Sequence, residues 1–131
     1  MFIDAPFDNS LGTETPILPA LNNILVRNQS YIDALDSIEN IILSEALQDT
    51  VVYPYQSEQF GAYQWTDAAG KSKPVTLEFN DTRNDQWAND LLGLRTRSQQ
   101  APNTLLLSSF EGDHIRFSDQ YWNDIIMPYL Q

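Results

Sequence analysis

The only histidine of the chain, His114, stands just beyond an apolar, strand-like segment that ends at Phe110. Gly112 lies between them and permits a tight turn. Histidine has an ordinary pKa near neutrality, so it can take up and release a proton during a reaction. A loop residue held by the end of a rigid strand is well placed for catalysis. A lone histidine is also commonly a hydrogen-bonded structural residue, so spacing alone leaves both interpretations open.

Asp49 follows another apolar segment, 65 residues before His114. In α/β-hydrolases an acid and a histidine at strand ends belong to a triad that runs nucleophile, acid, histidine along the chain. The histidine acts as general base, while the acid holds its tautomer and stabilises the imidazolium. The alternative for Asp49 is an aspartate that caps a turn, and 18 acidic residues offer many accidental pairs.

A nucleophile for this pair is missing from the sequence. None of the ten serines stands in the G-x-S-x-G motif of a nucleophile elbow, and there is no cysteine. The absence of cysteine also excludes disulfides and cysteine-ligated zinc. With one histidine and no EF-hand loop, we expect neither a metal site nor a cofactor.

The charge of the chain argues against two kinds of partner. Eighteen acidic residues against seven basic ones give a formal net charge of −11, which disfavours nucleic acid and anionic membrane surfaces. No apolar run approaches the length of a membrane span, and the N-terminus lacks the basic and apolar regions of a signal peptide. A hydrophobic content of 42% indicates a folded domain with a core.

We interpret residues 1–131 as a single α/β domain with an irregular, proline-containing lead-in over residues 1–19. Residues 28–47 fit either one helix or a helix followed by a strand, and periodicity does not decide between them. Further along we expect extended segments at 49–54, 61–65, 75–79 and 104–109, a turn at 69–72, and helices at 85–92, ended by Gly93, and at 118–126, capped by Ser118. This mixture predicts helices packed on a mainly parallel sheet.

Several segments together resemble the C-terminal part of palmitoyl-protein thioesterases. The matching segments are Glu111–His114, Phe117–Asp119, Tyr121–Leu130, Leu92–Leu94, Asp49–Pro54, Ser57–Gly61, Asn28–Tyr31 and Ile17–Asn22. The resemblance therefore covers most of the chain, and the combination is far more specific than any one motif.

The resemblance implies an α/β-hydrolase fold and roles for named residues. His114 matches the catalytic histidine of the family, and Asp49 matches the triad aspartate. The implied activity is hydrolysis of thioesters between fatty acyl chains and protein cysteines, so the implied partners are palmitoylated proteins or acyl thioesters. The resemblance also favours a helix near 29–38 followed by a strand near 39–47.

The same resemblance implies a lysosomal or secreted glycoprotein. Asn28 and Asn80 begin N-x-S/T sequons, and the family carries a sequon at the position of Asn28. Tyr53 departs from animal members, which often have another acidic residue there.

The sequence departs from the family most strongly in lacking the N-terminal half, which holds the signal peptide, the oxyanion donors and the G-x-S-x-G serine. We therefore expect hydrolysis to need a nucleophile from elsewhere, such as a chain that supplies the missing half. The alternatives are a non-catalytic truncated homologue that acts as an acyl-chain-binding or regulatory module, and an incomplete gene model.

Overall fold

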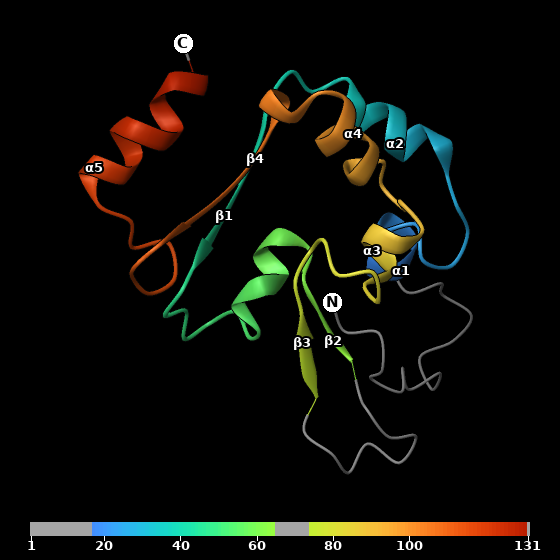
Figure 1. The fold of residues 1–131 in the computed structure, drawn as a ribbon, viewed down its shortest axis with the longest axis horizontal. Helices are drawn as coiled ribbons and strands as arrows, with labels where there is room; N and C mark the ends of the chain where they lie inside the picture. The colour runs from blue at the N-terminus through green and yellow to red at the C-terminus, as the bar shows by residue number, and fades with distance from the viewer. Residues whose placement is uncertain (1–16, 65–73, 131) are drawn as a thin grey trace.

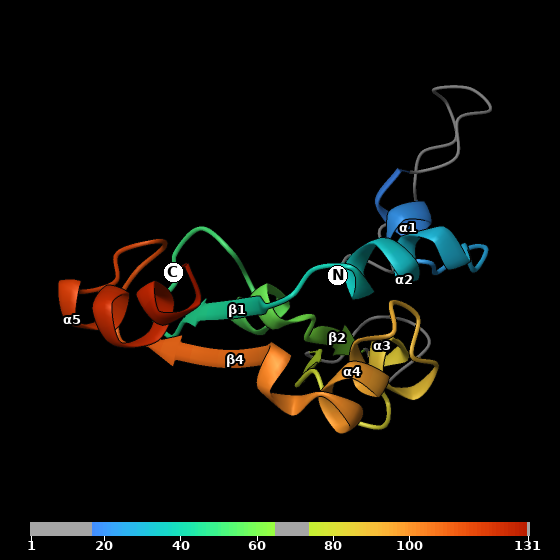
Figure 2. The ribbon, with the colours of Figure 1, turned by 90° about the horizontal axis from the view of Figure 1, so that it is seen from above.

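The fold is organised around two parallel strands that run side by side (Figures 1 and 2). The computed structural model describes residues 17–64 and 74–130. Strand β1 (Ile41–Ala46) pairs in parallel with β4 (Leu105–Phe110), and β2 (Ala62–Gln64) pairs with β3 (Val75–Leu77) in a separate antiparallel ribbon. The combination of helices with a small, mainly parallel sheet confirms the α/β character predicted from the sequence.

Short helices and turns precede, connect and follow these strands. The α-helices are α1 (Ile17–Leu21), α2 (Gln29–Asp36), α3 (Asp85–Ala88), α4 (Leu94–Gln100) and α5 (Asp119–Tyr121). α5 continues as a π-helical turn, Trp122–Ile126, and there are 3₁₀ turns at Tyr55–Gln59, Pro102–Thr104 and Met127–Tyr129. The 3₁₀ turn Tyr55–Gln59 is η2 below.

The ambiguous segment 28–47 divides into a helix and a strand, as the resemblance implies. Asn28 caps α2, because its side-chain oxygen accepts a hydrogen bond from the Ser30 backbone at 3.0 Å. The helix ends at Asp36, and β1 begins at Ile41. Ser118 likewise caps α5 as predicted, since its hydroxyl accepts from the Tyr121 backbone.

Four predictions of local structure need correction or lie outside the described residues. Residues 17–19 belong to α1 and not to an irregular lead-in, and residues 49–54 form turns and not an extended segment. The helix expected at 85–92 ends at Ala88, and Gly93 does not end a helix but immediately precedes α4. Gly93 has a φ of 75° and lies against Ile32, whose Cγ2 would be 2.8 Å from an added Cβ. The turn at 69–72 and residues 1–16 are outside the described residues.

The two faces of the β1–β4 pair meet different parts of the chain. One face packs on the core of Phe79, Leu92, Leu94 and Leu105, to which Ile41 and Leu43 of β1 contribute. Side chains alternate along a strand, so Ser44 points to the other face. There the Tyr121 hydroxyl lies 3.0 Å from the Ser44 hydroxyl and 2.7 Å from that of Ser108. These contacts anchor α5 to both strands.

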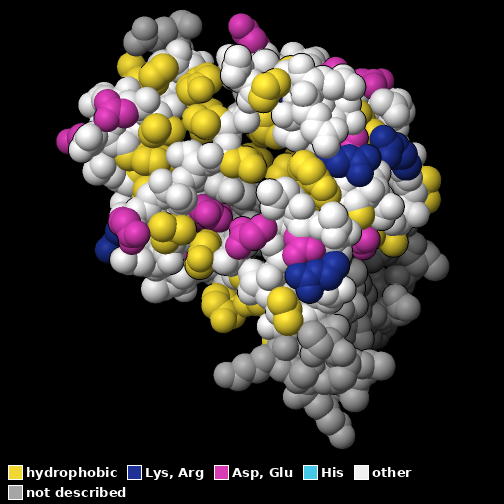
Figure 3. All heavy atoms as spheres, in the orientation of Figure 1, with side chains coloured by type: hydrophobic (Ala, Val, Ile, Leu, Met, Phe, Trp, Pro, Cys, Tyr) yellow, Lys and Arg dark blue, Asp and Glu magenta, His cyan; other side chains and the backbone are white. Residues whose placement is uncertain are grey.

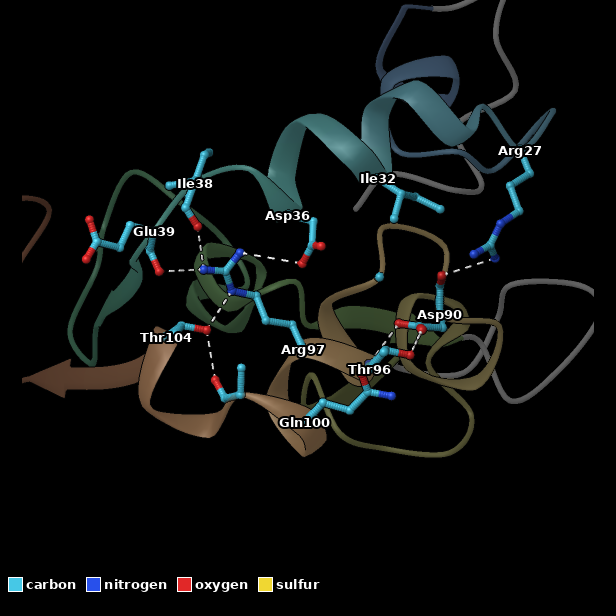
Figure 4. A pocket seen from close by; sticks show the side chains of 12 residues that line it. Arg27, Ile32, Asp36, Ile38, Glu39, Asp90, Thr96, Arg97, Gln100 and Thr104 are labelled. Carbon is cyan, nitrogen blue, oxygen red and sulfur yellow. Dashed lines mark hydrogen bonds and ion pairs between the residues drawn. The ribbon is translucent and has the colours of Figure 1, made fainter.

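Arg97 fixes the end of α2 and the start of β1 to α4 (Figure 4). Arg97 lines a cavity of about 440 Å³, but the residue is only 7% exposed. The guanidinium donates to the carbonyls of Leu35, Ile38 and Glu39 and to the Thr104 hydroxyl, at distances from 2.5 to 3.0 Å. Because these donors bond to groups of the chain itself, they are not available to a ligand. Arg97 is therefore a structural residue that holds these elements together.

Replacing Arg97 with methionine is expected to lower the free energy of unfolding by about 3 kcal/mol, because partly buried carbonyls lose a charged donor. Urea denaturation followed by circular dichroism measures this change. Arg95→Met on the same helix is the matched control, because Arg95 donates one exposed bond to the Ala88 carbonyl. We expect the control to lose less than about 1 kcal/mol. Equal losses in both variants would contradict the role of Arg97.

Candidate active site

The two sequence-predicted catalytic residues meet at one edge of the parallel pair. β1 and β4 are neighbours with the same direction, so the loops that follow them leave from the same edge. Backbone bonds continue beyond the strands, from Leu47 to the Phe110 carbonyl and from Gln48 to the Gly112 carbonyl. These bonds bring the loop of Asp49 alongside the loop of His114.

Asp49 and His114 form a direct hydrogen bond. His114 Nδ1 lies 2.7 Å from Asp49 Oδ2, across 65 residues of sequence. The other carboxylate oxygen, Oδ1, accepts from the backbone of Val51 at 2.6 Å and of Val52 at 2.7 Å. Asp49 therefore has both of the roles that the sequence left open, since it caps its own turn and also holds the histidine.

The environment of Asp49 keeps its carboxylate ionised. Its side chain is 0% exposed, and desolvation raises its pKa. Hydrogen bonds from the Val52 backbone, the His114 side chain and the Val51 backbone outweigh that effect and lower the pKa to about 2. The site therefore holds a negative charge beside the imidazole even in an acidic compartment.

The bond to Asp49 sets the tautomer of the neutral imidazole. Because an ionised carboxylate only accepts hydrogen bonds, Nδ1 of His114 must carry the proton between them. The Nε2 nitrogen then has a free lone pair that can accept a proton. The ring is 35% exposed, so a reacting group can reach it.

Asp113 ties the two loops together. Its Oδ1 accepts at 2.8 Å from the Thr50 backbone, the Thr50 hydroxyl and the His114 backbone. The Thr50 and His114 backbone bonds lower the pKa of this carboxyl. Next to it, a Cβ on Gly112 would lie 2.8 Å from the Arg116 carbonyl, so the tight turn requires glycine there.

Glu58 also lies at the site, although no role is predicted for it from the sequence. It lies on η2, where its Oε2 accepts from the Ala46 backbone at 2.7 Å. Its Oε1 lies 3.8 Å from His114 Nδ1. Burial raises the pKa of Glu58, and the neighbouring Asp49 raises it further. In the sequence, Glu58 stands out only as part of a segment that resembles the family. No spacing rule connects a 3₁₀ turn to the end of a preceding strand.

Asp49, Glu58 and His114 offer ligand atoms within 4.8 Å of one another, which is close enough for one cation. A cation bound by Nδ1 of His114 and Oδ2 of Asp49 would have to replace the hydrogen bond that joins these atoms. Oδ1 of Asp49 and Oε2 of Glu58 also have backbone partners. The arrangement therefore favours an acid–histidine pair over a metal centre.

An aspartate bonded to a half-exposed histidine, beyond adjacent parallel strands, is the arrangement that α/β-hydrolases use to activate a serine. Comparison with protein families agrees with this class. The palmitoyl protein thioesterase family matches residues 7–114, a range that contains Asp49 and ends at His114. The chain belongs to the palmitoyl protein thioesterase family, whose members are hydrolases. No helix within residues 17–64 and 74–130 is long and apolar enough to cross a membrane.

Proposed function

We propose that this chain provides the acid and the general base of a palmitoyl-protein thioesterase that cleaves fatty-acyl thioesters from protein cysteines. Asp49 orients His114, and His114 moves the proton. The observation that carries the proposal is the 2.7 Å bond between Asp49 Oδ2 and His114 Nδ1, which leaves Nε2 free to act as a base. Membership of the thioesterase family supports the substrate class.

The proposed reaction has two halves, in each of which His114 first accepts and then returns a proton. Nε2 takes the proton of a serine hydroxyl as the serine oxygen attacks the thioester carbonyl. The C–S bond breaks, the acyl group remains on serine, and the cysteine sulfur leaves with the proton returned by the imidazolium. Water then attacks the acyl-serine with Nε2 again as base, which releases the fatty acid and restores the serine.

The serine and the oxyanion hole must come from outside this sequence, because none of the ten serines has the G-x-S-x-G setting. Exposed apolar side chains on the surface of the chain support the proposal that a further segment packs against it. Leu107 on β4 is 40% exposed, and Trp122 and Leu130 beyond it are also exposed. Apolar side chains gather on the face in Figure 3, interspersed with carboxylates. A segment that supplies the remaining strands would cover apolar surface of this kind.

A lysosomal or secreted location fits the proposal. Asn28 and Asn80, which begin the two sequons, are both exposed. A glycan on Asn28 Nδ2 would leave its oxygen to cap α2. The low pKa of Asp49 would keep its carboxylate ionised beside His114 in an acidic lumen.

Reconstitution tests the proposed function. The chain is mixed with the separately produced N-terminal half of a family member that carries G-x-S-x-G, and release of palmitate from a palmitoyl-cysteine peptide is measured. We expect hydrolysis only when both parts are present. The control replaces the elbow serine with alanine, which should abolish release. A stable complex without hydrolysis would contradict the proposal and favour the alternative of a non-catalytic binding module.

A further inference from the structure

Glu58 connects the end of β1 to the acid–histidine pair. Its side chain is only 16% exposed. Oε2 accepts from the backbone of Ala46, the last residue of β1, and Oε1 lies 3.8 Å from Nδ1 of His114. One carboxylate oxygen of Glu58 lies within 4.8 Å of one carboxylate oxygen of Asp49. Glu58 therefore lies beside both proposed catalytic residues.

Two carboxylates this close repel each other, which favours a proton shared between the two groups. Asp49 already accepts two backbone N–H groups and the His114 ring, and all three bonds stabilise its ionised form. Glu58 has one backbone donor and lies in a desolvated position. A proton shared between the two groups would therefore reside on Glu58, with Asp49 as its acceptor.

We propose that Glu58 is a positioning residue whose protonated carboxyl accepts from the Ala46 backbone and donates to Asp49, thereby holding Asp49 against His114. This inference rests on the proposed function only for its catalytic consequence. It adds a third member to the acid–histidine pair and anchors that pair to β1 through one side chain.

The arrangement makes the pair sensitive to the ionisation of Glu58. The titratable groups that act on Glu58 are Asp49 after β1 and His114 after β4, and Glu58 in turn acts on Glu45 of β1. Burial and the Asp49 charge raise the pKa of Glu58 above 4.5, while His114 and the Ala46 bond lower it. When Glu58 ionises, its hydrogen bond to Asp49 is lost, and a second negative charge appears near the imidazole.

Two substitutions separate the hydrogen bonds of Glu58 from its charge. In Glu58→Gln, the amide oxygen can accept from Ala46 while the amide nitrogen donates to Asp49. This variant therefore imitates protonated Glu58 at every pH. Glu58→Ala removes both bonds. Glu39→Gln is the matched control, because it makes the same chemical change at an exposed position before β1 begins.

Nuclear magnetic resonance of the whole chain tests the proposal, because His114 is the only histidine and its ring signals need no further assignment. In the wild type, we expect the ring shifts to show a separate step as Glu58 ionises above pH 4.5. Glu58→Gln should remove this step, and Glu39→Gln should retain it. Exchange of the Nδ1 proton with water should be about tenfold faster in Glu58→Ala and within about twofold of wild type in Glu58→Gln.

Persistence of the step in Glu58→Gln, or its loss in Glu39→Gln, would overturn the proposal. Unchanged Nδ1 proton exchange in a folded Glu58→Ala variant would also overturn it. These measurements need no serine and no substrate. An absence of thioesterase activity in the reconstituted assembly would therefore refute the proposed function while leaving the positioning role of Glu58 intact.

Discussion

Replacing His114 with alanine is expected to lower kcat of the reconstituted thioesterase by about 10⁴-fold or more. No other histidine exists in the chain to accept the serine proton. The serine would then have to attack as a neutral hydroxyl, and the thiolate would leave without a proton donor in the ring's position. Steady-state release of palmitate from a palmitoyl-cysteine peptide measures the loss.

Arg116→Ala is the control for His114→Ala because it lies two residues along the same loop and is exposed. We expect its kcat to remain within about threefold of wild type, since such surface changes usually have small effects. Both variants should unfold at temperatures near that of the wild type and still form the assembly. A His114→Ala enzyme that retains wild-type turnover would remove His114 from the mechanism.

Replacing Asp49 with asparagine is expected to lower kcat by about 10⁴-fold while preserving the turn. The amide oxygen can still accept from the Val51 and Val52 backbone, which leaves the NH₂ group facing His114 Nδ1. Nδ1 must then become the acceptor, so the ring proton moves to Nε2. In that tautomer Nε2 cannot take a proton from serine. Kinetics measure the loss, and ¹⁵N shifts of the His114 ring report the exchanged tautomer.

Asp113→Asn is the matched control for Asp49→Asn, because Asp113 also accepts backbone N–H groups beside the histidine. Its oxygen can continue to accept them after the change, so we expect a loss of tenfold at most, roughly one weakened hydrogen bond. Equal losses in the two variants would show that any charge change in these loops disrupts activity. They would contradict a specific role for Asp49.

Asp49 should also affect the stability of the chain in acid. Its folded pKa is about 2, below the ordinary 3.8, so its ionised form stabilises the fold above pH 3.8. That contribution is lost as the pH falls through the folded value. The difference in unfolding free energy between wild type and Asp49→Asn should therefore shrink from pH 4 to pH 2. Urea denaturation at these pH values measures it, and a constant difference would contradict the assignment.

The approach of Asp49 to His114 could be predicted because it depends on few features. Each residue follows an apolar strand, and parallel neighbours bring their carboxyl ends to one edge. Periodicity alone did not separate α2 from β1, since the isoleucines at their junction suit both. The resemblance to the family resolved that choice, and residues 29–36 and 41–46 are a helix and a strand as it implied.

Helix α4 and the role of Glu58 could not be predicted because both depend on distant backbone. α4 is largely polar, and the burial of Arg97 is compensated by carbonyls about 60 residues earlier in the chain. Gly93 does not end a helix as expected, and its lack of a Cβ allows the close approach of Ile32. Glu58 reaches the site only because η2 folds back on the end of β1. Local sequence patterns do not indicate such contacts between residues that are far apart in the chain.

The central claim is that Asp49 and His114 work as one catalytic unit, and a double-mutant cycle tests it most directly. kcat of the reconstituted thioesterase is measured for wild type, Asp49→Asn, His114→Ala and the double variant. If Asp49 acts only through His114, its loss should cost nothing further once the imidazole is gone. We therefore predict that the double variant will match His114→Ala. A double variant whose loss is the product of the two single losses would contradict the account.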